Sequence, residues 1–321
     1  MQLKKLILII LSLALIFGFG VYSAIDYLPV TATPAAAVLP KKVEEKPQFL
    51  FALGDGDKGK LKQPISLAID EKGRIYVTDA GDYSVKVYLP DGKYYRSFGQ
   101  KGTGHSGFGY PYGIGFLKSG DLVISDSVNS NVRVFSKGGK YKKTLIEAKQ
   151  KIRPGALVID QDGQIYISDL MNHQILVVTP KGKIVRKVKP IFFSLKYPQE
   201  LVVNPSSHSI WVADSGNFAV KEINSNGLVT STVRSWGEPP QAFSLVRGMS
   251  IDSLNRLVVA DTVNGTVHVM SLQGKELFSI DGKGSPAGNF VYPSYIFVDG
   301  TGRIYVADRG TGLVQVWGYK K

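Results

Sequence analysis

The chain has 321 residues, a length that fits either two ordinary domains or one large all-β domain. It contains 35 glycines, 16 tyrosines and 15 phenylalanines but only 4 methionines, a balance that favours strands and turns over helices. The absence of cysteine excludes disulfides, thiolate metal sites, haem attachment through cysteine and a lipoprotein anchor. The formal charge of +13 favours acidic partners.

The first segment is an uncharged, mostly apolar run from Leu6 to Ile25, preceded by Lys4 and Lys5 and ended by Asp26. A helix of this length spans about 30 Å, the thickness of the hydrocarbon core of a bilayer. The positive-inside rule keeps the two lysines in the cytoplasm. We therefore expect residues 1–27 to form a transmembrane signal anchor that places the rest of the chain outside the cytoplasm.

The next segment, residues 28–47, is rich in proline, alanine, threonine and charge, which is typical of a flexible linker. It contains the best small-residue sequence for cleavage, Ala35 to Ala37, which lies far beyond the apolar run. An uncleaved anchor is therefore favoured, and a secreted protein is the alternative.

From residue 48 to residue 321 one pattern recurs six times. Its most regular part is a short strand that ends in aspartate, at 74–79, 121–126, 164–169, 209–214, 256–261 and 303–308. A first strand opens about 15 residues earlier, with proline in five repeats and Val246 in the fifth repeat. A third and a fourth strand follow each aspartate. Four antiparallel strands in about 45 residues are the pattern of a propeller blade.

The sixth repeat ends after its third strand, which would leave an unpaired sheet edge. The missing strand is found at the start of the domain, because residues 49–54 resemble the fourth-strand segments 95–99 and 277–282. We expect residues 48–54 to pair with the strand at 314–318 and close the ring. The predicted fold is an all-β, six-bladed propeller of four-stranded antiparallel blades, preceded by one transmembrane helix.

The proline opening, the Val-x-Asp strand and the following Asn-x-x-(Val/Ile) resemble NHL repeats over residues 48–321. The resemblance implies a six-bladed propeller. That family includes RNA-binding proteins, protein-interaction modules, a zinc-dependent lyase acting on peptides and exported bacterial proteins without an assigned role. The exported type is the one that this chain resembles, and the fold alone does not fix the function.

The six aspartates that end the second strands suggest either a ring of metal ligands or a set of turn-builders. We favour turn-builders, because one aspartate in every repeat can accept hydrogen bonds from backbone N–H groups of its own loop.

Function is expected where the repeats differ, on the face formed by the loops entering each first strand and the loops joining second to third strands. Tyrosine and arginine, which make directional contacts with partners and anions, are frequent there. The alternative for the tyrosines is packing between blades. The predicted binding residues surround the mouth of the central channel and are Tyr110, Tyr112, Arg153, Tyr197, Gln199, Arg247, Tyr292 and Arg309.

Catalytic signatures are weak. The four histidines fall in different parts of the repeat, whereas a catalytic zinc site needs three converging ligands. Of the first-strand starts that would line the channel, only Glu200 is acidic, which is too few for calcium. We expect no catalytic residue, metal or cofactor. The alternative is a propeller hydrolase or lyase with a metal at the channel.

Basic residues are concentrated between Lys137 and Lys196, where 13 lysines and arginines face 4 acidic residues. They lie mainly on the predicted outer strands of blades two and three, where they either protect the edge or dock on anionic lipid or glycan. Nucleic acid is not expected for an exported protein. The sequence predicts a non-catalytic, membrane-tethered binding or scaffolding propeller outside the cytoplasm, with a protein or other anionic partner.

Overall fold

A computed structural model of the chain describes residues 46–204, 207–234, 242–282 and 286–319. The expected membrane helix at 1–27 lies outside the described residues, as does the expected linker up to residue 45. Among the residues that are described, no helix has the length and apolarity needed to cross a bilayer.

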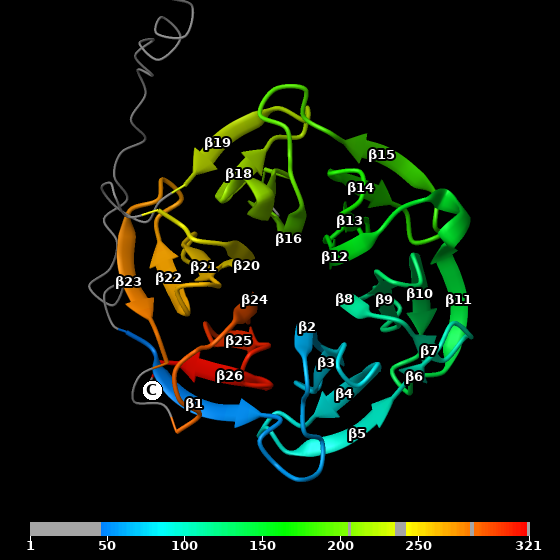
Figure 1. The fold of residues 1–321 in the computed structure, drawn as a ribbon. Coiled ribbons are helices and arrows are strands. Elements are labelled where there is room, and N and C mark those ends of the chain that lie inside the picture. The colour runs from blue at the N-terminus through cyan, green and yellow to red at the C-terminus, as the bar shows by residue number, and fades with distance from the viewer. Residues whose placement is uncertain (1–45, 205–206, 235–241, 283–285, 320–321) are drawn as a thin grey trace, which may run out of the picture. The chain divides into compact units, whose positions relative to one another are not determined.

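The described residues form six four-stranded antiparallel sheets arranged as blades around a central channel, which confirms the predicted propeller (Figure 1). The innermost strands are β2 (Pro64–Ile69), β8 (Pro111–Phe116), β12 (Pro154–Ile159), β16 (Pro198–Val203), β20 (Val246–Ile251) and β24 (Pro293–Val298). The second strands are β3 (Ile75–Asp79), β9 (Leu122–Asp126), β13 (Ile165–Asp169), β17 (Ile210–Asp214), β21 (Leu257–Asp261) and β25 (Ile304–Asp308).

The third strands are β4 (Ser84–Tyr88), β10 (Asn131–Phe135), β14 (Gln174–Val178), β18 (Ala219–Ile223), β22 (Thr266–Met270) and β26 (Leu313–Gly318). The outer strands are β5 (Tyr94–Phe98), β11 (Tyr141–Ile146), β15 (Ile184–Val188), β19 (Val229–Val233), β23 (Glu276–Ile280) and β1 (Gln48–Leu53). Short additions are β6 (Gln100–Lys101), β7 (Gly107–Phe108) and two 3-10 turns, η2 (Ala148–Gln150) and η3 (Ser215–Asn217).

The ring is closed by β1, which pairs antiparallel with β26 from Gln48 opposite Gly318 to Leu53 opposite Val314. An edge-to-face contact between Phe49 and Trp317, with ring centroids 5.8 Å apart, supports the seam. The predicted closure is confirmed, and it removes the free edge that the sixth blade would otherwise expose.

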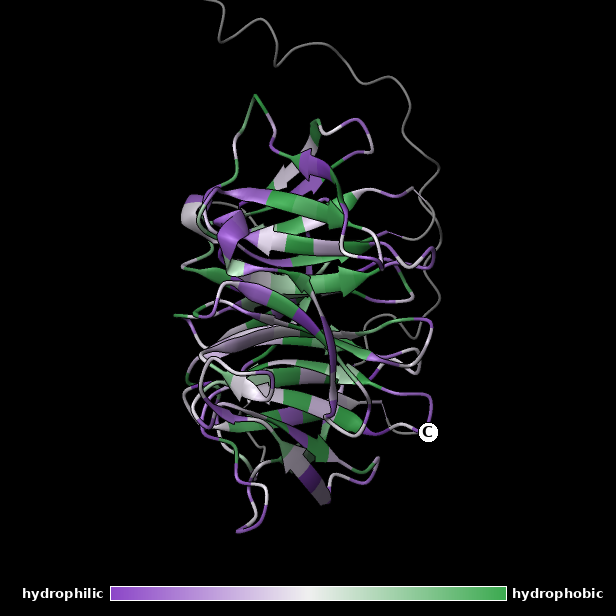
Figure 2. Cartoon of the chain, turned by 90° about the vertical axis from the view of Figure 1, so that its right-hand side faces the viewer, coloured by the Kyte–Doolittle hydropathy of each residue, from purple (hydrophilic) through white to green (hydrophobic). Residues whose placement is uncertain are grey.

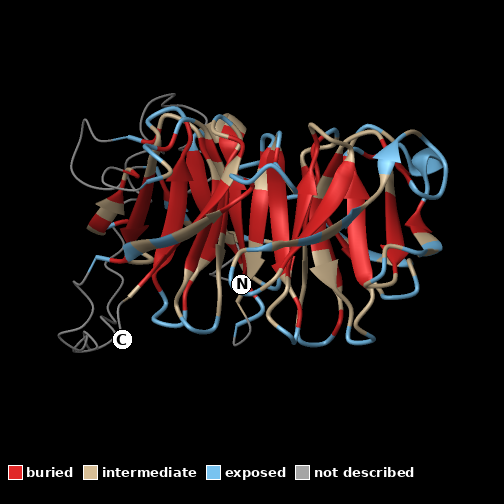
Figure 3. Cartoon of the chain, turned by 90° about the horizontal axis from the view of Figure 1, so that it is seen from below, coloured by how far each residue is buried: buried red, intermediate tan, exposed pale blue. Residues whose placement is uncertain are grey.

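The core lies between neighbouring blades, because each second strand is buried along its whole length, while outer strands such as β5 and β15 alternate half-buried and exposed side chains. At the closing seam Ile75 and Val77 of β3 share a cluster with Tyr305 and Ala307 of β25. Figure 2 shows apolar strands with hydrophilic loops, and Figure 3 shows the same strands buried between exposed loops at both ends.

The register brings two sets of loops to one edge of the ring. Pro64 pairs with Asp79, and the first residue of every inner strand likewise pairs with the aspartate ending the second strand of its blade. The entry loops and the second-to-third-strand loops therefore lie together. We call this edge the mouth face, and the edge with the other turns the opposite face.

Candidate functional site

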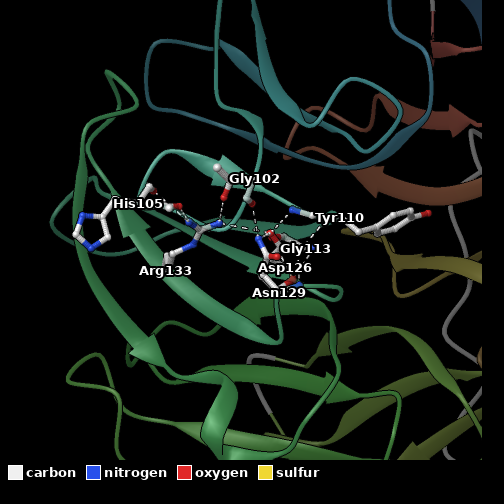
Figure 4. Close-up of polar contacts among 11 residues, drawn as sticks. Gly102, His105, Tyr110, Gly113, Asp126, Asn129 and Arg133 are labelled. Carbon is white, nitrogen blue, oxygen red and sulfur yellow. Dashed lines mark hydrogen bonds and ion pairs between the residues drawn. The ribbon is translucent and has the colours of Figure 1, made fainter.

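The mouth face is organised by the repeated aspartates, which are fully buried. In the second blade the carboxylate of Asp126 accepts hydrogen bonds from the backbone N–H groups of Gly109 at 2.8 Å and Tyr110 at 2.9 Å, and from the Asn129 side chain at 2.9 Å (Figure 4). The Tyr110 ring points away from this network (Figure 4). The carboxylate thus fixes the backbone of the residue that precedes the first-strand proline.

The same bond recurs around the ring. Asp79 accepts from the N–H of Gln63 at 2.8 Å, and Asp308 accepts from Tyr292 at 2.8 Å. Asp126 also accepts from the N–H of Asn129 in its own loop at 3.0 Å. The prediction that these aspartates build turns is confirmed. The bonds to the entry loop, 16 to 18 residues upstream, were not predicted, and they position the candidate binding residues.

Three blades reinforce this network with a buried cation on the third strand, seven residues after the aspartate. Lys86 pairs with Asp79 at 2.8 Å and Lys221 with Asp214 at 2.7 Å. In the second blade Arg133 lies 3.4 Å from the Asp126 carboxylate, and it also donates to backbone carbonyls such as Gly104 O at 2.8 Å. These cations are at most 5 % exposed and belong to the scaffold.

A cavity of about 420 Å³ opens on the mouth face. Six of the eight predicted binding residues line it, drawn from blades two to six, together with three residues that were not predicted. The lining consists of Tyr110, Tyr112, Arg153, Gln199, Arg247 and Arg309, with Ser127, Val128 and Leu170.

Tyr292 lies directly behind this lining. The guanidinium of Arg247 lies 5.3 Å from the centroid of its ring, and that of Arg309 lies 5.7 Å from the same centroid. One aromatic ring therefore supports two of the three arginines by cation–π contact.

Tyr197 is not brought to the cavity. Its backbone adopts a left-handed conformation with φ of 52°, its N–H donates to Nδ1 of His173 at 3.2 Å, and its ring packs edge-on against that imidazole. Asp214 accepts from the N–H of Lys196 at 2.6 Å, as Asp126 accepts from Gly109, but the N–H of Tyr197 bonds to His173 and not to the aspartate. The Tyr197 side chain is 45 % exposed.

The charge of the cavity is one-sided, because three guanidinium groups line it and none of its lining residues is acidic. The Nε atoms of Arg247 and Arg309 are buried and have no hydrogen-bond partner within the described part of the chain. A buried N–H group without an acceptor destabilises the folded protein unless a ligand or a water molecule accepts its hydrogen bond. The arrangement thus offers hydrogen-bond donors to an anion.

The two cavity tyrosines are neutral donors. Burial raises the pKa of Tyr110, against the opposing charges of Arg309 and Arg247. Burial also raises the pKa of Tyr112, whose hydroxyl bonds to Oε1 of Gln199. Neutral phenols beside guanidinium groups add no negative charge, and the Tyr112 hydroxyl proton is already donated to Gln199.

Below the mouth, the channel walls are the six inner strands. Glu200 is 5 % exposed there, and burial raises the pKa of its carboxyl well above the usual value. Gly113 and Gly248 allow neighbouring inner strands to approach, because a Cβ at either position would lie 2.5 to 2.6 Å from the backbone of the next blade. Among the described residues that line the channel, Glu200 is the one acid, and it lies beside apolar residues such as Leu201 and Met249.

The architecture was compared with that of known proteins. No family model matches the sequence. The mouse E3 ubiquitin-protein ligase NHLRC1 is 26 % identical over 195 residues, 57 % of this chain and 48 % of that protein. The human E3 ubiquitin-protein ligase TRIM32 is 21 % identical over 259 residues, 72 % of this chain and 39 % of that protein. These similarities and the six-bladed architecture support an NHL-repeat β-propeller family for this chain. The chain spans less than half the length of these curated relatives.

Solved structures agree with the NHL propeller at the level of the fold. Virginiamycin B lyase from Staphylococcus aureus is 15 % identical, with a TM-score of 0.58 over 86 % of this chain and 99 % of that one. An auxiliary nutrient binding protein from Bacteroides ovatus is also 15 % identical, with a TM-score of 0.65 over 87 % of this chain and 74 % of that one. At this identity the likeness concerns the fold alone.

The histidines of the NHL propeller occupy four different surroundings. His105 stacks on Tyr141 with ring centroids 4.1 Å apart, and His173 contacts Tyr197. His268 lies on β22 with its Nδ1 2.8 Å from a Glu276 carboxylate oxygen. The fourth, His208, follows the inner strand β16 on the opposite face. No three His, Cys, Asp or Glu side chains gather at a potential metal site among the described residues.

Two groups of residues at the site were not predicted from the sequence. Ser127, Val128 and Leu170 follow second-strand aspartates and carry no chemistry that distinguishes them from other loop residues. The buried cations had a usable signal, because a lysine or arginine stands seven residues after Asp79, Asp126 and Asp214. A cation at a fixed offset from a repeated acid indicates a pair inside the blade.

The predicted basic rim divides into two groups. Some of its cations join blades, since Lys143 on β11 donates to the Pro180 carbonyl at 3.1 Å and Arg186 on β15 to the Ser225 carbonyl at 2.6 Å. Others, such as Lys187 and Lys189, are exposed. The rim is thus partly structural.

Proposed function

We propose that this NHL propeller is a non-catalytic binding or scaffolding module whose mouth holds an acidic group of a protein partner. The observation that carries the proposal is the convergence of Arg153, Arg247 and Arg309 on one cavity without a lining carboxylate. Two relatives named as ubiquitin-protein ligases match through this repeat region, which supports a protein partner.

The recognition rests on the shape of the guanidinium group and on its fixed position. Arginine presents a planar fork of donors that matches carboxylate or phosphate in two parallel bonds. Stacking on Tyr292 holds Arg247 and Arg309 in place before the ligand arrives, so little side-chain entropy is lost on binding. The hydroxyl of Tyr112 and the amide of Gln199 complete the polar lining.

The proposal includes the tether expected from the sequence. The apolar run at 6–25 would anchor the propeller at the outer side of the cytoplasmic membrane. Mass spectrometry of the mature protein tests the anchor. An N-terminus before residue 6 supports it, and one beyond residue 23 would show that the segment is cleaved.

Crosslinking of the whole chain in its own membranes, followed by mass spectrometry, tests the mouth. Arg153→Ala combined with Arg247→Ala is expected to lose the crosslinked partner. Lys72→Ala combined with Lys275→Ala is the matched control, because it removes the same charge from exposed turns of the opposite face. An unchanged set of partners in the arginine variant would contradict the proposal.

Elemental analysis separates binding from the hydrolase or lyase alternative. The whole chain is titrated with zinc and calcium after dialysis. Weak, non-stoichiometric uptake agrees with a binding module, whereas one tightly held ion per chain would favour the metal-dependent enzyme.

A further inference from the structure

Figure 1 shows the connection between β15 and β16. It contains three large apolar residues in a row whose side chains are exposed. Ile191 is 91 % exposed, Phe192 73 % and Phe193 68 %, and we call them the apolar tip. The connection enters an inner strand, so it belongs to the mouth face. Contiguous exposed apolar residues on a soluble domain mark an interaction site.

The tip is held outward by the scaffold. Pro190 and Leu195, on either side of it, are buried. The Phe193 carbonyl accepts a hydrogen bond from Nζ of Lys221 at 2.8 Å, and the Ser194 carbonyl accepts from the same atom at 3.0 Å. Because Lys221 is itself paired with Asp214 inside the blade, the backbone of the tip is anchored while its side chains project.

Cations flank the tip. Lys187, Lys189 and Lys196 are exposed, and none of them forms an ion pair with a described carboxylate. The sequence from 180 to 199 contains no acidic residue. An aromatic and aliphatic tip between unpaired lysines matches the two layers of a lipid interface, acyl chains below and anionic headgroups above.

We propose that the apolar tip inserts into the interfacial layer of an anionic membrane, with the three flanking lysines on its headgroups. Charge complementarity favours a lipid surface over an apolar groove on a protein, because a groove would have to cover the three lysines as well. The inference is independent of the ligand of the mouth.

The absence of cysteine permits a direct test. The whole chain carrying Phe192→Cys is labelled with an environment-sensitive fluorophore and reconstituted with phosphatidylcholine vesicles containing or lacking phosphatidylserine. Leu254→Cys, an exposed apolar position in a turn of the opposite face, is the control. Nitroxide-labelled lipids report contact with acyl chains.

The expected result is a blue shift and nitroxide quenching at position 192 in phosphatidylserine vesicles, with neither at position 254. Each replacement of Lys187, Lys189 or Lys196 by Gln is expected to lower the ratio of lipid-contacting to free propeller about fivefold. Emission at 192 as water-like as at 254 would overturn the proposal. A blue shift without nitroxide quenching, appearing only after membrane proteins are added, would also overturn it and assign the tip to a protein.

Discussion

Cations in this propeller occupy two kinds of place, one buried inside the blades and one half-buried at the mouth. Inside the blades, Lys86, Arg133 and Lys221 each lie within 3.4 Å of an aspartate carboxylate and donate to loop carbonyls. At the mouth, Arg247 and Arg309 lie over Tyr292, and no acidic residue lines their cavity. The same residue types therefore serve the scaffold where an acid is present and remain available for a ligand where it is absent.

The difference between the paired cations inside the blades and the arginines at the mouth predicts different effects of mutation on stability and on binding. Removing one partner of a buried pair leaves an uncompensated charge, which is strongly destabilising. Removing a cation that has no acidic partner leaves nothing uncompensated in the protein. We therefore expect the two groups to respond oppositely in unfolding and in binding experiments.

The largest effect is expected for Lys221→Met, which leaves the fully buried Asp214 without its cation. The free energy of unfolding should fall by about 3–5 kcal/mol in urea denaturation. Lys187→Met, an exposed lysine on β15, is the control and should change stability by less than about 0.5 kcal/mol. Equal stability of the two variants would show that the pairing of Lys221 with Asp214 does not stabilise the fold.

A second effect concerns Glu200, a buried acid that forms no ion pair within the described part of the chain. Its pKa is raised in the folded state above the usual 4.5, so its contribution to stability is complete below pH 4.5 and is lost as the pH rises through the folded pKa. Glu200→Gln should match the wild type at low pH and exceed it progressively above pH 4.5. Unfolding free energies measured from pH 4 to 9 test this, and parallel curves for the two proteins would contradict the raised pKa.

The smallest effect on stability is expected for Arg247→Ala combined with Arg309→Ala. Neither guanidinium has an ion pair among the described residues, so the free energy of unfolding should change by less than about 1 kcal/mol, mainly through lost contact with Tyr292. Thermal and urea unfolding provide the measurement. A loss as large as that of Lys221→Met would assign these arginines to the scaffold.

The sequence was sufficient for the fold because repetition compensates for weak single motifs. The six (Val/Ile)-x-Asp strands, the proline openings and the resemblance of residues 49–54 to outer strands predicted the blades and their closure. Six of the eight predicted mouth residues line one cavity for the same reason, since the repeat register places them at one height.

The features that were not predicted from the sequence depend on the local backbone conformation. Tyr197 lies outside the cavity, and its left-handed backbone directs its N–H to His173 rather than to Asp214. The sequence contains a signal for this difference, because Pro198 stands 16 residues before Asp214, whereas the first strands of the other blades open 15 residues before their aspartates. In the sequence, the apolar tip at 191–193 resembles an ordinary apolar stretch before a strand. Only the structure shows that its side chains are exposed, while Pro190 and Leu195 on either side are buried.

Binding of an acidic probe tests the central claim most directly. Fluorescence polarisation of a labelled hexaglutamate peptide is measured against the whole chain, against Arg247→Ala with Arg309→Ala, and against Lys72→Ala with Lys275→Ala. We predict that the arginine variant weakens binding at least about tenfold, because each charge-assisted hydrogen bond contributes roughly 1.5–3 kcal/mol, while the lysine control binds like the wild type. Equal affinities for the two variants would show that the probe reads the overall positive charge, and the mouth would not be the binding site.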